Sequence, residues 1–79
     1  MIIIDVRTPE EYAHGHVGSA MNIPLDQIAQ GSVPPVGLDE KIVLYCRSGG
    51  RAEQAKIYLE AAGYQNVTNA GGMSDMTKS

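Results

Sequence analysis

The sequence predicts an α/β fold with a small, mainly parallel sheet that carries helices on both faces. Short apolar runs rich in β-branched residues, which are typical of buried parallel strands, occur at residues 2–6, 20–23, 41–45 and 67–68. Segments with helical patterning alternate with these runs, as they do in parallel α/β folds. With 79 residues the chain has room for one domain, residues 1–79, and it contains no internal repeat.

The first strand is followed by the clearest helix start in the chain. Thr8 suits the N-cap position, and Pro9 suits the first helical position. Glu11 lies three residues after Thr8 and completes a capping box. Gly15 then ends the helix, which is therefore predicted to be short.

Charged residues surround the end of the first strand, and a second strand follows. We expect Asp5 and Arg7 to brace the strand end and the next loop through charge-assisted hydrogen bonds.

The second strand, residues 20–23, ends at Pro24, and residues 25–30 are predicted to form about one turn of helix.

The central strand, residues 41–45, leads directly to the longest predicted helix. This helix begins near Arg51 and ends at Gly63, a residue type typical of helix C-termini. Its apolar residues recur at helical spacing, which predicts a single buried face made by Ala55, Tyr58, Leu59 and Ala62.

The only cysteine, Cys46, lies where this strand ends and this helix begins. Free N–H groups in the first turn of a helix attract anions, and at such positions the pKa of a cysteine falls by roughly one to several units. A lone cysteine is also commonly a buried apolar filler. Gly49 and Gly50 favour a tightly curled loop instead, and Arg47 and Arg51 add positive charge. The pattern indicates a nucleophilic cysteine in an anion-binding loop. The alternative for the two arginines is that they are ordinary surface residues, either solvated or paired with a nearby acidic side chain.

Four stretches of the chain resemble the rhodanese family of sulfurtransferases, in particular its short single-domain members. The stretches are IDVRTPEEY at residues 4–12, GHVGSAMNIP at 15–24, CRSGGR at 46–51 and NAGGM at 69–73. They occur in the order that the family has and cover nearly the whole chain. The resemblance implies a single rhodanese domain over residues 1–79.

The resemblance also implies a reaction and a site. Cys46 would be the catalytic nucleophile of a thiosulfate sulfurtransferase, taking sulfane sulfur from a small sulfur-containing anion as a persulfide. A thiol, a thioredoxin-like protein or cyanide would then accept the sulfur, which makes the kinetics ping-pong. The substrate-binding residues would be those of the loop after the cysteine: Arg47, Ser48, Gly49, Gly50 and Arg51.

The resemblance carries expectations for the end of the chain as well. Gly71 and Gly72 are expected to begin a turn beside the cysteine loop. Family members often have a tryptophan where this chain has Met76. We therefore expect a weaker anchor here and a mobile tail from Ser74 onward.

Two other functions compete with this prediction. Cysteine-dependent phosphatases and arsenate reductases also place a cysteine and an arginine around an anion-binding loop, but the phosphatases have five residues between them. This chain has four residues between Cys46 and Arg51, which makes a tighter ring. The other competitor is a rhodanese-like sulfur carrier or binding module without turnover.

Composition limits the partners that we expect. The net charge of −3 and the pI near 5.1 argue against nucleic acid, and no apolar run is long enough to span a membrane. A single cysteine excludes a cysteine-based zinc cluster, and we expect no metal and no cofactor. We expect a monomer. The compartment stays open: a native start at Met1 implies the cytoplasm, and a removed signal segment implies the periplasm.

Overall fold

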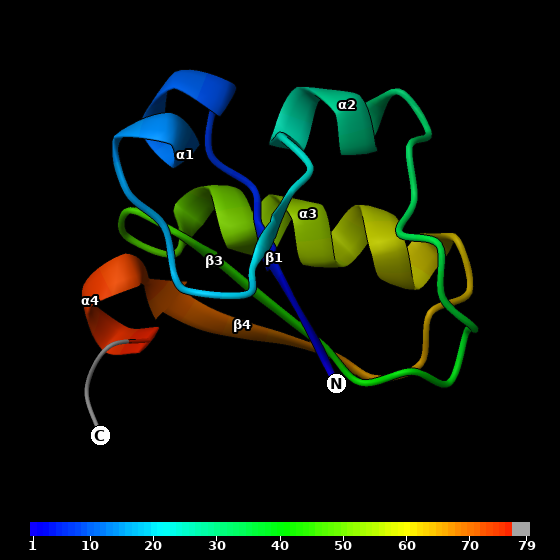
Figure 1. Ribbon diagram of the computed structural model, residues 1–79. Helices are drawn as coiled ribbons and strands as arrows, with labels where there is room; N and C mark the ends of the chain where they lie inside the picture. The colour runs from blue at the N-terminus through cyan, green and yellow to red at the C-terminus, as the bar shows by residue number, and fades with distance from the viewer. Residues whose placement is uncertain (77–79) are drawn as a thin grey trace.

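The computed structural model describes residues 1–76, which alternate between strands and helices (Figure 1). In chain order the elements are β1 (Ile2–Asp5), α1 (Pro9–His14), β2 (Met21–Asn22), α2 (Leu25–Ala29), β3 (Ile42–Cys46), α3 (Gly50–Ala61), β4 (Val67–Gly72) and α4 (Met73–Met76). Of the tail that was predicted to be mobile, residues 74–76 belong to α4, and the remainder lies outside the described residues.

The sheet has four strands in the order β2-β1-β3-β4, and every neighbouring pair is parallel. The predicted α/β class with a parallel sheet is therefore confirmed. The central strand β3 pairs with β1 on one side and β4 on the other. Because all strands run in the same direction, their carboxyl ends meet at one edge, where ligands bind in folds of this type.

The hydrophobic core lies between the sheet and the helices α2 and α3. Strand residues Ile4, Ile42 and Leu44 are fully buried there, together with Ala52, Ala55 and Leu59 of α3 and Ile28 of α2. The predicted buried face of α3 was wrong in part, since Tyr58 is 44% exposed and Ala62 is also exposed. The helix buries a narrow stripe of small residues and one leucine, because it packs closely against β3 and β4.

A buried polar network braces the opposite face of the sheet at its carboxyl end. Arg7 donates to both carboxylate oxygens of Asp5, at 2.8–3.1 Å, and the Tyr45 hydroxyl donates to Asp5 Oδ2 at 2.8 Å. The Val17 backbone N–H donates in turn to the Tyr45 hydroxyl, and Arg7 Nη2 donates to the Gly15 carbonyl. The predicted brace is present, and it fixes the path of the chain after α1.

The start of α1 has the predicted capping box. The Thr8 hydroxyl accepts from the Glu11 backbone N–H at 3.2 Å, and Glu11 Oε1 accepts from the Thr8 backbone N–H at 3.1 Å. The helix ends at His14 and is followed by Gly15, as predicted. His16 stacks on the Tyr12 ring, with 3.7 Å between centroids.

Strand β4 is longer than predicted, because it continues through Gly71 and Gly72. An irregularity in its pairing brings Gly72 opposite Cys46 at the end of β3. Glycine and asparagine have low strand propensity, so local sequence gave no sign of this extension.

Within residues 1–76, no helix is long and apolar enough to cross a bilayer.

Candidate active site

The loop after β3 holds Cys46 at the carboxyl edge of the sheet. Cys46 is the last residue of β3, and α3 begins only four residues later, at Gly50. The chain therefore turns tightly from the strand into the helix. The Gly49 backbone N–H donates to Cys46 Sγ at 2.9 Å, and Cys46 is only 1% exposed.

Backbone dipoles around Sγ favour the thiolate. Burial raises the pKa of the Cys46 thiol, but the nearby backbone N–H groups of Ala52, Ser48, Gly49 and Arg51 favour the thiolate and together bring the pKa below its ordinary value. These N–H groups include the free donors that the start of a helix leaves unpaired. The loop can therefore hold a sulfur anion without a neighbouring general base.

Glycines allow the loop to curl around the sulfur and to lie against β4. Gly49 has a φ of +96°, in the left-handed region that favours glycine. A Cβ at Gly49 would lie 3.3 Å from the Gly71 Cα, so the two backbones approach closely. Gly72 lies beneath the Arg47 backbone in the same way. Gly71 and Gly72 thus lie beside the loop, as predicted, but they end strand β4 and do not begin a turn.

Asn69 of β4 ties the loop to the sheet. Its Nδ2 donates to the Gly49 carbonyl at 3.0 Å and to Glu53 Oε1 at 3.1 Å. Its Oδ1 accepts from the Gly71 backbone N–H at 2.8 Å. One amide side chain therefore holds both the turn of the loop and the bend of β4.

The two arginines of the loop have different surroundings. Arg47 is exposed, as is Ser48. Arg51 is partly buried and donates to both oxygens of Glu11 on α1, at 2.7 and 3.1 Å. The ion pair lowers the pKa of Glu11 to about 2, chiefly through the Arg51 hydrogen bond and then through Thr8. It also raises the pKa of Arg51.

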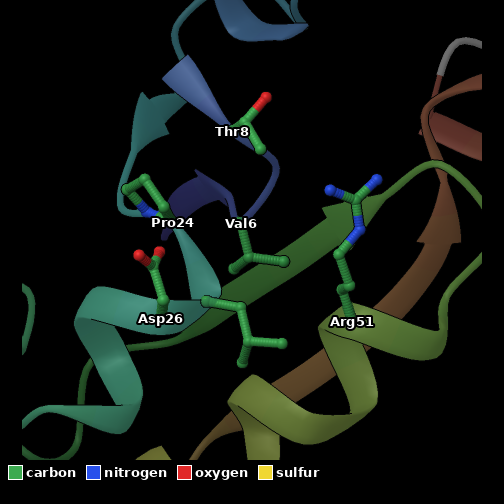
Figure 2. A pocket seen from close by; sticks show the side chains of 6 residues that line it. Val6, Thr8, Pro24, Asp26 and Arg51 are labelled. Atoms are coloured by element: carbon green, nitrogen blue, oxygen red, sulfur yellow. The ribbon is translucent and has the colours of Figure 1, made fainter. Parts of the chain in front are cut away.

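Clefts open on both sides of this ion pair. One, of about 290 Å³, lies between the starts of α1, α2 and α3 (Figure 2). Its walls are mainly apolar and come from Val6, Thr8, Pro24, Leu25, Asp26 and Arg51. The other cleft is charged, with walls from Arg7, Glu10, Glu11, His14 and Arg47. Within residues 1–76, no three His, Cys, Asp or Glu side chains are grouped to hold a metal ion.

The six predicted site residues, 46–51, therefore run from the end of β3 through the loop into the first turn of α3, and two residues that the sequence did not assign to the site contact this segment. Glu11 was predicted only as a helix cap, and the sequence separation of 40 residues gave no sign of its pairing with Arg51. Asn69 was part of a recognised motif without a role of its own.

Comparisons with known proteins agree with this geometry. The family model of the rhodanese-like domain matches residues 1–79. The thiosulfate sulfurtransferase PspE of Escherichia coli K12 is 40% identical over 74 residues, which are 92% of this chain and 71% of that protein. A tRNA uridine(34) hydroxylase of Erwinia tasmaniensis is 34% identical over 90% of this chain, but the match covers only 22% of the enzyme.

Solved structures give the same assignment. A structure described as a rhodanese with anions from E. coli superimposes with a TM-score of 0.83 and 38% identity, covering 99% of this chain and 93% of the other. The relatives include sulfurtransferases. The chain belongs to the family of rhodanese-like domains.

Proposed function

We propose that this protein is a sulfurtransferase that moves sulfane sulfur from thiosulfate, or a similar donor, to a thiol or cyanide. The observation that carries the proposal is the position of Cys46 Sγ, which accepts a hydrogen bond from the Gly49 backbone N–H and lies where neighbouring backbone N–H groups favour its thiolate. Such preorganised dipoles stabilise an anion in place and need no reorganisation during the reaction.

The reaction would proceed in two displacements at sulfur. The Cys46 thiolate attacks the outer sulfur of thiosulfate, a new S–S bond forms, and the bond to the sulfonate group breaks, which releases sulfite. The persulfide carries the negative charge that the thiolate had. Cyanide or a thiolate then attacks the outer sulfur, and the S–S bond to Cys46 breaks. Thiocyanate or an acceptor persulfide forms, and Cys46 is left as the thiolate.

The other loop residues would assist these steps in different ways. The backbone N–H groups of Ser48 and Gly49 hold both the thiolate and the persulfide. Arg47 is exposed at the loop, and its charge would attract the dianionic donor. Thiosulfate has its transferable sulfur at one end and its sulfonate oxygens at the other, so the sulfur can enter the ring while the oxygens face Arg47.

The first experiment is intact-protein mass spectrometry after incubation with thiosulfate and again after addition of cyanide. Because Cys46 is the only cysteine, a gain of one sulfur can be assigned without mapping. We expect the gain to appear with thiosulfate, to disappear with cyanide, and to be absent from Cys46→Ser. A thiolate that reacts with iodoacetamide but acquires no sulfur from any sulfane donor would contradict the proposal.

The phosphatase alternative can be tested on the same samples. Hydrolysis of p-nitrophenyl phosphate that depends on Cys46, without sulfur transfer, would favour it. Transfer to the cysteine without release to cyanide, dithiothreitol or thioredoxin would favour a carrier without turnover.

A further inference from the structure

An ion pair between Glu11 and Arg51 lies next to the loop that holds Cys46. Arg51 is the second residue of α3, directly after the loop that holds Cys46, so its side chain starts beside the proposed anion site. The guanidinium nevertheless points toward Thr8 at the start of α1 (Figure 2). There it makes a two-pronged ion pair with Glu11, at 2.7 and 3.1 Å.

Glu11 is well suited to hold Arg51 in this position. Its carboxylate also accepts from the Thr8 backbone N–H and hydroxyl, at 3.1 and 3.2 Å, so the rotamer is fixed by the helix cap. The side chains of Glu11 and Arg51 are only 23% and 35% exposed. A pair with this geometry and partial burial is stronger than an ordinary surface ion pair.

The two arginines of the loop are therefore not equivalent. Within the described part of the chain, the Arg47 guanidinium makes no ion pair, whereas that of Arg51 is neutralised. A guanidinium binds the oxygens of a phosphate or sulfate two at a time. A free Arg51 beside the ring of N–H groups would complete such an oxyanion site.

We propose that Glu11 is a positioning residue that withholds Arg51 from the anion site and so makes the loop select a sulfane donor over phosphate and sulfate. This inference rests on the proposed sulfurtransferase function. The sulfane sulfur of a donor needs only the backbone N–H groups, whereas phosphate places its charge on oxygens that compete for a guanidinium. Removing the Glu11 charge should therefore strengthen phosphate binding more than it strengthens donor binding.

The variant Glu11→Gln tests this role, because glutamine also serves in a capping box and keeps the start of α1. Glu10→Gln is the matched control, since it removes one negative charge from the residue directly before Glu11 in the same helix. The double variant Glu11→Gln with Arg51→Gln removes the arginine that the proposal says is released. Melting temperatures of all three variants show whether the fold is retained.

Protection of Cys46 from iodoacetamide by inorganic phosphate is the direct measurement. We expect Glu11→Gln to lower the phosphate concentration for half-protection about tenfold, the factor that one hydrogen bond to a charged group contributes. Glu10→Gln should change it less than about twofold, as expected for a screened surface charge. The double variant should return to the wild-type value.

Kinetics with thiosulfate supply the second measurement. In Glu11→Gln, phosphate should become a stronger competitive inhibitor, while KM for thiosulfate changes less than the inhibition constant. Equal effects of Glu11→Gln and Glu10→Gln, or tight phosphate binding that persists in the double variant, would overturn the inference. The protection assay needs only a reactive Cys46, so a protein that fails to transfer sulfur would contradict the proposed function without deciding this inference.

Discussion

Gly72 lies against the backbone of the loop that follows Cys46, and Gly72→Ala tests how tightly the two are packed. A Cβ at this position would lie 3.0 Å from the carbonyl carbon of Arg47 and closer still to its oxygen. Carbon atoms in contact prefer separations of about 3.5–4.0 Å. Both neighbours belong to the backbone, so the overlap can be relieved only if β4 or the loop moves. Gly72 does not have a positive φ, so the effect of alanine would be purely steric.

The expected cost follows from this overlap. Overpacking in a rigid environment costs about 1–3 kcal/mol. In a domain of this size, a loss of about 2 kcal/mol lowers the melting temperature by roughly 8–16 °C. Displacement of the Arg47 carbonyl also changes the path of the chain next to Cys46. We therefore expect slower alkylation of the cysteine by iodoacetamide near neutral pH, because the N–H groups around Sγ lose their alignment.

Thermal unfolding and alkylation rates measured on the same samples check this prediction. The matched control is Gly18→Ala, because a Cβ at Gly18 meets no atom within 4 Å and its φ is not positive. That variant should melt within a few degrees of wild type. If Gly72→Ala has the same melting temperature and alkylation rate as Gly18→Ala, the loop does not rest on β4 as the structure indicates.

Three further predictions concern the residues around the loop. Tyr45→Phe removes a hydrogen bond to the buried Asp5 carboxylate and should lower the free energy of unfolding by about 1–2 kcal/mol in urea titrations. Asn69→Ala should raise the pKa of Cys46 in pH-dependent alkylation, because the turn at Gly49 loses the hydrogen bond from the Asn69 amide. Asn66→Ala, which loses one exposed hydrogen bond of the same kind, should leave that pKa unchanged. The pKa of Glu11 falls from 4.5 to about 2 on folding, so its pair stabilises the fold fully above pH 4.5 and is lost as the pH falls toward 2. Acid melting curves should therefore decline less steeply in Glu11→Gln than in wild type.

Features that depend on neighbouring residues in the chain could be predicted from the sequence. The capping box of Thr8 and Glu11 involves residues three apart, and the helix stop at Gly15 is a local signal as well. The strand that delivers Cys46 was visible as a β-branched apolar run. Since the carboxyl ends of parallel strands meet at one edge, the position of the cysteine loop followed from the fold class.

Features that depend on tertiary contacts could not be predicted in this way. Glu11 satisfies its cap with one oxygen, and nothing in the local sequence indicates that the same carboxylate binds an arginine 40 residues away. The extension of β4 through Gly72 also depends on a tertiary contact. Glycine is needed there because β4 comes close to the loop that follows Cys46. The burial of α3 also depended on its neighbours: packing against β3, β4 and α2 selected Ala52 rather than Tyr58 for the core.

The site divides the tasks of the proposed reaction between the backbone and the side chains. Burial alone would raise the pKa of Cys46, and it is the backbone N–H groups that bring the pKa down. Those groups cannot be removed by changing a side chain, and in the proposed reaction they would hold the sulfur anion both as the thiolate and as the persulfide. In this proposal the side-chain charges select the donor: Arg47 is exposed and would attract it, whereas Arg51 is paired with Glu11. In this proposal the backbone activates Cys46 and the arginines select the donor. Substitutions at the arginines, or at Glu11, would therefore change donor preference while Cys46 stays an active nucleophile.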